Sequence, residues 1–224
     1  MTSFASRMGK RYTNDYSDEE LRKQAGDLEN AVTIPVNVEI KADHRVLDLS
    51  EVEGYLKKAK KIGLQNCGCR VEKGNCDAPR NVCISIDPPD GFFSKNARYG
   101  ARQSTQKEAL DALRRSHEAG LVHMAYTMKG DDRATLICSC CPCCCTTLGG
   151  LLRFGIATKV LTSKFVAEED YKKCVGCGRC VDRCVFGARS LEADELVFDS
   201  SQCFGCGLCV STCPAGAIAL KPRT

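Results

Sequence analysis

The chain has 224 residues, of which 43% are hydrophobic and 27% charged, and its formal net charge is +4. These totals favour a globular protein of one large or two smaller domains over a disordered chain. There is no run of about 20 apolar residues, so we predict no membrane-spanning helix. The first residues also lack the apolar segment of a secretory signal, and we therefore expect a cytoplasmic protein.

The first segment, residues 1–30, is polar and charged. We expect an N-terminal arm with a short helix over residues 17–28. The arm either contacts a partner or, as its charge pattern favours, is a solvated surface helix. Residues 31–40 are rich in β-branched side chains and predict a strand, which Pro35 would place at the edge of a sheet. A further strand is predicted over residues 82–86, before a pair of prolines.

Two helices are predicted from capping boxes, in which a serine or threonine precedes a glutamate by three residues. The two boxes are Ser50 with Glu53 and Thr105 with Glu108. The first helix should cover about residues 51–60. The second should end near Ala119, because Gly120 is a typical helix stop, and a strand should follow over residues 121–127. This mixture predicts an α+β protein whose residues 31–165 form a cysteine-rich domain of α/β type.

The cysteine content is the most informative feature of the composition. There are 18 cysteines, none of them within the first 66 residues. In a chain of this length without an export signal, they indicate metal binding rather than a disulfide framework. Metal-bound cysteines are thiolates, and an oxidised four-iron cluster held by four of them carries roughly two negative charges. Two such clusters would cancel the +4, so we expect no nucleic-acid partner.

Residues 166–224 contain two copies of one cysteine motif, CVGCGRCVDRC and CFGCGLCVSTC. Each copy is C-x2-C-x2-C-x3-C. Its first three cysteines wrap one cubane cluster, and its fourth, which we expect to begin a helix and point away, reaches the other cluster. Zinc is disfavoured because zinc ribbons use separated C-x2-C pairs. The predicted ligand sets are Cys174, Cys177, Cys180 and Cys213 for one [4Fe-4S] cluster, and Cys203, Cys206, Cys209 and Cys184 for the second.

This region resembles the bacterial two-[4Fe-4S] ferredoxins. Pro214 follows Cys213 as the family pattern requires, whereas Val185 takes the corresponding place after Cys184, a departure that removes no ligand. The resemblance implies two clusters within electron-tunnelling distance, low reduction potentials and one-electron transfer.

Ten further cysteines lie upstream, four of them spaced C-x-C-x6-C-x6-C and six crowded into ICSCCPCCC, which we interpret as a ligand loop. Ten are too many for one ordinary cluster. They fit either two cubanes, or one double-cubane or non-cubane assembly in which adjacent cysteines serve neighbouring irons. We therefore expect one or two further iron–sulfur clusters. The candidate ligands are Cys67, Cys69, Cys76, Cys83, Cys138, Cys140, Cys141, Cys143, Cys144 and Cys145.

A few other polar residues are candidates for the site. We expect His117 on the second helix and His123 on the following strand. Each has either a functional role, as an iron ligand or a proton donor near a cluster, or a purely structural role. His44 has no supporting context. Arg70, directly after a cysteine, is either a donor to cluster sulfur or a plain surface arginine. Four arginines are candidate docking charges, although ordinary solvated surface is favoured: Arg98, Arg102, Arg114 and Arg115.

The upstream blocks IGLQNCGCR, NCDAPRNVCIS, HEAGLVHMAYT and LICSCCPCCC resemble a group of ferredoxin-like iron–sulfur proteins of anaerobic prokaryotes with no assigned reaction. No P-loop and no dinucleotide-binding G-x-G-x-x-G is present, so electrons should pass to or from another protein. We predict a multi-cluster electron-transfer protein or subunit that serves a larger redox enzyme. The alternative is a reductase whose upstream domain holds a special cluster supplied by the ferredoxin module. A non-redox role in zinc or cluster delivery is disfavoured.

Overall fold

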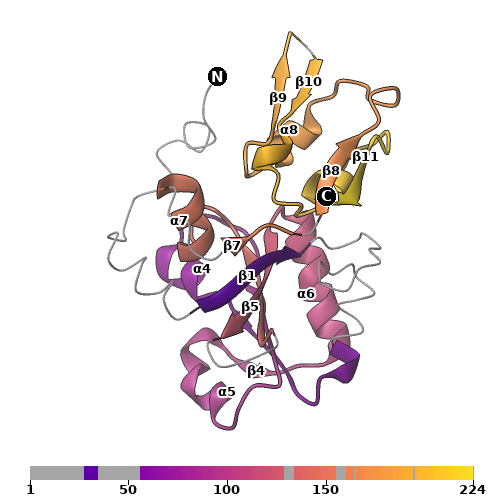
Figure 1. The fold of residues 1–224 in the computed structure, drawn as a ribbon. Helices are drawn as coiled ribbons and strands as arrows, with labels where there is room; N and C mark the ends of the chain where they lie inside the picture. The colour runs from indigo at the N-terminus through magenta and orange to yellow at the C-terminus, as the bar shows by residue number, and fades with distance from the viewer. Residues whose placement is uncertain are drawn as a thin grey trace.

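A computed structural model describes residues 28–34, 56–128, 134–154, 160–163, 165–193 and 195–223 (Figure 1). Three predicted features therefore lie outside the described residues: His44, the Ser50–Glu53 capping box and the helix predicted within the arm. Only the last residue of that helix is described. Of the helix predicted over about 51–60, residues 56–60 are described; residues 56–58 are helical, and residues 59 and 60 are not.

Upstream of the ferredoxin-like region the elements are, in chain order, β1 (Leu28–Ile34), β2 (Ile62–Asn66), α4 (Gly68–Lys73), β3 (Asn81–Ile86), α5 (Phe92–Lys95), η2 (Ala97–Tyr99), β4 (Arg102–Gln103), α6 (Gln106–Glu118), β5 (Val122–Met128), β6 (Leu136–Cys140), α7 (Thr146–Phe154) and β7 (Val160–Leu161). The C-terminal elements are β8 (Phe165–Glu169), α8 (Arg179–Arg183), β9 (Arg189–Glu192), β10 (Glu195–Phe198), η3 (Ser200–Gln202), α9 (Leu208–Thr212) and β11 (Ile218–Pro222).

The upstream strands form a seven-stranded sheet in the order β4-β2-β3-β6-β5-β1-β7. Its neighbours are antiparallel except for β1 and β7, which are parallel. The strand predicted over residues 31–40 corresponds to β1, which begins three residues earlier. Its predicted edge position is wrong, because β7 hydrogen-bonds to the side of β1 that β5 leaves open.

Helix α6 begins as its capping box predicts. The Glu108 N–H donates to the Thr105 hydroxyl at 3.2 Å, and the Thr105 N–H donates to the Glu108 carboxylate at 2.8 Å. Gly120 follows the helix with a φ of 80°, a backbone conformation that glycine adopts without strain. The buried face of α6 includes Leu110 and Leu113, which share one apolar cluster with β2, β3 and β6.

The two faces of the sheet differ in chemistry because side chains alternate along each strand. Along β6, Ile137 belongs to the apolar cluster under α6, whereas Cys138 and Cys140 pack with Met124 and Tyr126 of β5. Figure 1 shows α6 on one side of the sheet and α4 and α7 on the other. Part of the predicted ligand loop is therefore strand β6, and the face opposite α6 carries its cysteines.

The C-terminal module repeats one unit, a cysteine loop followed by a short helix. Helices α8 and α9 each begin after a glycine of positive φ, Gly178 at 71° and Gly207 at 73°. Each helix contains the third cysteine of its motif and ends at the fourth, Cys184 or Cys213. The prediction that the fourth cysteine begins a helix is wrong, because the glycine starts the helix two residues before the third cysteine.

The C-terminal module packs directly on the upstream sheet. Phe186 and Leu208 of the module belong to the same apolar cluster as Met124, Tyr126 and Leu148. A second contact lies at the end of α6, where the Arg183 guanidinium donates to the carbonyl groups of His117 and, at 3.0 Å, Glu118. Within the described ranges, no helix is both long and apolar enough to cross a bilayer.

Candidate iron–sulfur and metal sites

The first cavity of the C-terminal module lies on the outside of the molecule and is called here the outer site. The cysteines that line it are Cys174, Cys177, Cys180 and Cys213. Val175 and Leu191 line it too and are 67% and 42% exposed. Cys177 itself is exposed, so this site reaches the surface.

The second cavity, the inner site, is lined by the other predicted set: Cys184, Cys203, Cys206 and Cys209. Its remaining walls include Phe186, Phe204 and Leu208, and the rings of Phe186 and Phe204 stack with their centroids 4.4 Å apart. Burial raises the pKa of Cys209 to about 12 and that of Cys206 well above its usual range. Such thiols become thiolates only when a cation binds them, which fits a metal cluster.

A buried ion pair lies between the two C-terminal sites. The side chains of Arg189 and Glu169 are 1% and 5% exposed, and the guanidinium donates to the carboxylate. Burial works against the charge of Arg189. Even so its pKa is raised, by the neighbouring thiol groups of Cys209 and Cys180 together with Glu169. Arg189 thus places a positive charge beside one cysteine of each site.

Six of the upstream cysteines form a closed ring of neighbouring thiols, called here the six-cysteine ring. Around it, each thiol interacts with the one before and the one after, in the order Cys67, Cys83, Cys138, Cys140, Cys145, Cys69 and back to Cys67. Every member is buried or half-buried. Six sulfurs exceed the four that one ordinary cubane takes.

The ring is assembled from four elements that meet on the sheet face opposite α6. Strands β3 and β6 supply three cysteines, the start of α4 supplies two, and the residue before α7 supplies the last. The N-terminal end of α7 faces the ring. The Leu148 N–H donates to the Cys145 sulfur at 3.4 Å, and the Thr146 N–H donates to that of Cys69. These donors and the helix dipole favour negative charge on the sulfurs.

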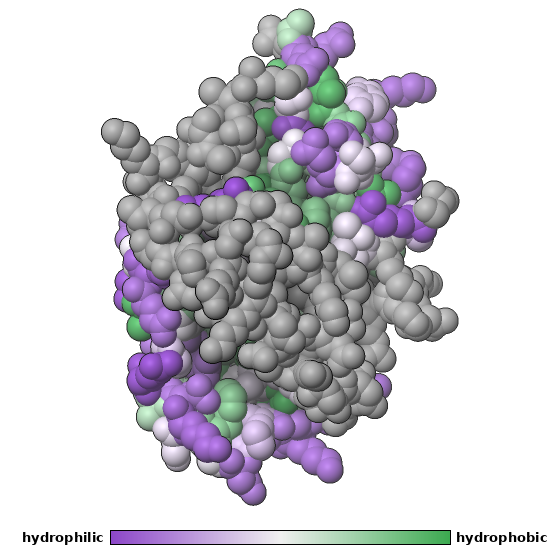
Figure 2. Space-filling model, turned by 60° about the vertical axis from the view of Figure 1, so that its left-hand side comes forward, coloured by the Kyte–Doolittle hydropathy of each residue, from purple (hydrophilic) through white to green (hydrophobic). Residues whose placement is uncertain are grey.

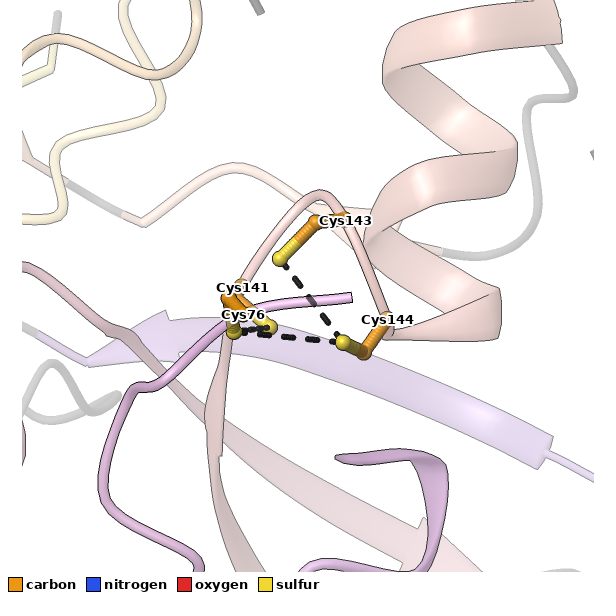
Figure 3. A group of neighbouring side chains, drawn as sticks. All are labelled: Cys76, Cys141, Cys143 and Cys144. Atoms are coloured by element: carbon orange, nitrogen blue, oxygen red, sulfur yellow. Dashed lines mark hydrogen bonds between the residues drawn. The ribbon is translucent and has the colours of Figure 1, made fainter. Parts of the chain in front are cut away.

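The remaining four upstream cysteines gather separately, as Figure 3 shows. The sulfur atoms of Cys76, Cys141, Cys143 and Cys144 all lie within 4.8 Å of one another. Cys140 and Cys141 are adjacent in sequence but belong to different groups, because β6 ends between them. Cys143 and Cys144, by contrast, are adjacent in sequence and belong to the same group.

Arg70 lies between the two upstream groups and is fully buried. Its Nη1 donates to the Ser139 carbonyl at 2.9 Å and to the Cys141 sulfur at 3.5 Å. Its Nε and Nη2 are buried and have no acceptor among the residues that the structure describes. Burial opposes its charge, yet the thiol groups of Cys67 and Cys141 raise its pKa. A buried cation with open donors fits a site that carries negative charge, and the interpretation as a plain surface arginine is wrong.

The two candidate histidines stack on each other with their centroids 5.9 Å apart. Burial lowers the pKa of His117 to about 4 and that of His123 to about 3, so both imidazoles are neutral near pH 7. Among the described side chains their hydrogen-bond partners are serines: His117 Nε2 with Ser211 at 2.6 Å, and His123 Nδ1 with Ser139 at 3.1 Å.

Three of the candidate docking arginines form ion pairs on the surface of their own domain. Arg98 pairs with Glu72, Arg102 with Glu108 and Arg114 with Asp111. These contacts fit the favoured interpretation, in which the three arginines belong to the ordinary solvated surface.

Residues 173–217 match a known protein family, the 4Fe-4S dicluster domain. The match covers both cavities of the C-terminal module except for their outermost lining residues, and it stops short of the upstream cysteines. No curated protein matches the chain. The C-terminal region is therefore a ferredoxin-type iron–sulfur module, and the region upstream of it also carries clustered cysteines.

Proposed function

We propose that this protein is an electron relay. In this proposal the outer and inner sites each hold a [4Fe-4S] cluster, and the six-cysteine ring holds a further iron–sulfur centre. Such clusters supply one-electron oxidation and reduction. The protein's own residues bind the clusters, set their order and exclude water between them. The partner is a larger redox enzyme or another electron-transfer protein.

The observation that carries the proposal is the shared apolar cluster between the inner site and the ring. Cys140 and Cys145 of the ring pack in the same cluster as Phe186 and Leu208, which line the inner site. Cys206 of the inner site packs against this cluster as well. Ligands of the two sites are thus joined by dry side-chain contacts, a short path for an electron.

A hydrogen-bonded path runs beside that apolar contact. Ser211 lies in the module between Cys209 and Cys213, and its hydroxyl contacts His117. His117 stacks on His123, and His123 contacts Ser139, which lies between two members of the ring. The two imidazoles therefore connect ligand-bearing segments of both regions, and in this proposal they hold those segments in register.

The outer site is the place where a partner would exchange electrons. Its ligand Cys177 is exposed, and apolar side chains line the site beside it, among them Leu191 at 42% exposure and Val175 at 67%. Figure 2 shows hydrophobic residues interspersed with hydrophilic ones over the C-terminal module, in the upper part of the molecule. The proposed order is partner, outer site, inner site and six-cysteine ring.

A redox titration followed by electron paramagnetic resonance, on the full chain purified without oxygen, tests the relay. Two module clusters hold about eight irons, and the upstream centre should add more. We expect the upstream signal to titrate and to broaden by magnetic coupling when the module is reduced. Cys83→Ala should remove the upstream signal and keep those of the module. Cys177→Ala, the matched control, should alter the outer cluster alone. An upstream centre that is not reduced while both module clusters are reduced would contradict the proposal.

A reductase is the second candidate function, favoured by the six sulfurs of the ring. The ring has more sulfurs than one cubane needs, and this surplus suits a special cluster. Tyr126 faces the ring, with its hydroxyl 3.9 Å from the Cys140 sulfur. The test is to add cyanide or carbon monoxide to the reduced protein. A change confined to the upstream signal supports the reductase, whereas unchanged spectra favour the relay.

A further inference from the structure

The four cysteines outside the ring have the geometry of a site for a single metal ion. In Figure 3, Cys141, Cys143 and Cys144 come from the turn before α7 and Cys76 from the segment between α4 and β3, and their sulfurs converge. The sulfur–sulfur distances include 3.7 Å from Cys76 to Cys141, 3.9 Å from Cys76 to Cys144 and 3.8 Å from Cys144 to Cys143.

These distances match the edge of a tetrahedron around one ion. Four sulfurs at about 2.3 Å from a central Zn²⁺ are separated from one another by about 3.8 Å. In a cubane each cysteine binds a different iron, so its four sulfurs lie farther apart. The eight cysteines of the ferredoxin module provide an internal comparison. Among the residues that the structure describes, only the four-cysteine group has all its ligand atoms within 4.8 Å of one another.

Two of the four sulfurs accept hydrogen bonds of the kind that stabilise thiolates. Arg70 donates to the Cys141 sulfur at 3.5 Å, and the Cys144 N–H donates to the same sulfur. The N–H of Asn75 donates to the Cys144 sulfur, while the Asn75 side-chain amide donates to the Cys143 carbonyl at 3.0 Å. A divalent ion with four thiolates carries about two negative charges, which these donors and the buried guanidinium offset.

We propose that Cys76, Cys141, Cys143 and Cys144 bind one divalent ion, Zn²⁺ or Fe²⁺, in a tetrahedral site separate from the iron–sulfur clusters. All four positions around the ion are taken by protein, as in structural zinc sites, so it offers no place for a substrate. The ion ties the segment between α4 and β3 to the turn that leads into α7. This fixes the turn, and with it Cys140 and Cys145 at its two ends. The inference goes beyond the relay, which does not depend on it.

Metal analysis and X-ray absorption of the full chain, purified without oxygen, test the proposal. We expect one zinc per chain, surrounded by four sulfurs at a single distance and with no neighbouring metal. If the ion is Fe²⁺, zinc is absent and one iron exceeds the cluster content, with the visible spectrum of a four-thiolate iron after oxidation. Cys76→Ala should lose one metal ion. Cys177→Ala, the matched control at the outer site, should keep it.

A loss of about four irons in Cys76→Ala would overturn the proposal, since those cysteines would then hold a cubane. So would a wild-type protein that contains neither zinc nor a mononuclear iron. Because the absorption measurement uses the wild-type chain, it decides the matter even if the variant does not fold. The module's resonance signals, which report on the relay, should be unchanged in Cys76→Ala, so the two proposals fail separately.

Discussion

The two cysteine-rich regions build their sites in different ways. In the C-terminal module, each site takes two cysteines from one loop, a third from the helix that follows it and a fourth from the end of the other copy's helix. The spacing along the chain therefore carries the whole arrangement. In the upstream domain, strands, helix ends and turns bring together cysteines up to 78 positions apart, and the sheet decides which ones meet. A local motif predicts its ligands, whereas a site built on tertiary structure requires the fold.

Each region also buries one arginine beside its sulfurs, and the two differ in their partners. Arg189 has a carboxylate partner, Glu169, as well as nearby thiols. Arg70 has a carbonyl and a sulfur. Within the described part of the chain, two of its nitrogens lack an acceptor, compared with one nitrogen of Arg189. We infer that Arg189 serves the stability of the module, and that the charge of Arg70 is balanced mainly by what the upstream cysteines bind.

The largest effect is expected for Arg189→Met. The change leaves Glu169 buried without its cation, which typically costs about 3–5 kcal/mol. We expect a large fall in the guanidinium concentration at which cluster absorbance is lost. Lys221→Ala is the matched control, because Lys221 pairs with Glu168 at 2.6 Å while both side chains are about half exposed. Such surface pairs contribute about 0–1 kcal/mol. Equal shifts in the two variants would contradict the role given to Arg189.

A smaller and different effect is expected for Arg70→Met. Loss of a buried positive charge beside the upstream sulfurs should lower the reduction potential of the ring centre and leave the module's potentials unchanged. Two unit charges about 10 Å apart interact by about 1.7 kcal/mol at an effective dielectric constant of about 20, and for one electron about 1.4 kcal/mol corresponds to about 59 mV. We therefore expect a fall of roughly 60 mV or more in a redox titration. The control is Arg98→Met, because Arg98 is exposed and 3.8 Å from Glu72. A fall of similar size in the control would argue against a local effect of Arg70.

The same contrast explains how far the sequence could predict this protein. The capping box of α6, the strands at β3 and β5 and the iron–sulfur nature of the C-terminal module follow from local patterns, and the structure or the family match agrees with them. The division of the ten upstream cysteines into six and four does not follow from spacing. Cys140 and Cys141 are neighbours in sequence, and they separate because β6 ends at Cys140. Likewise, the burial of Arg70 depends on β6 and the turn after it, far along the chain.

The contact between the two regions can be tested with a pair of glycines. Gly120 and Gly74 both have positive φ, 80° and 62°, so alanine at either position adopts a backbone that costs about 1–2 kcal/mol. At Gly74 an added methyl group meets nothing within 4 Å. At Gly120 it would lie 2.9 Å from Nη1 of Arg183, which joins the module to the end of α6.

Gly120→Ala should therefore lower the free energy of unfolding more than Gly74→Ala does, because Arg183 must move away from the Glu118 carbonyl. The difference should be about 0.5–1.5 kcal/mol, the net contribution of one hydrogen bond. The second readout is the magnetic coupling between the ring centre and the reduced module. Since Arg183 is a residue of α8, which ends at Cys184 of the inner site, its displacement should weaken the coupling in Gly120→Ala and leave it unchanged in Gly74→Ala. Equal coupling in both variants, with the extra destabilisation present, would mean that Arg183 fastens the module without setting the distance between the centres. The apolar contact through Phe186 and Leu208 would then set that distance alone.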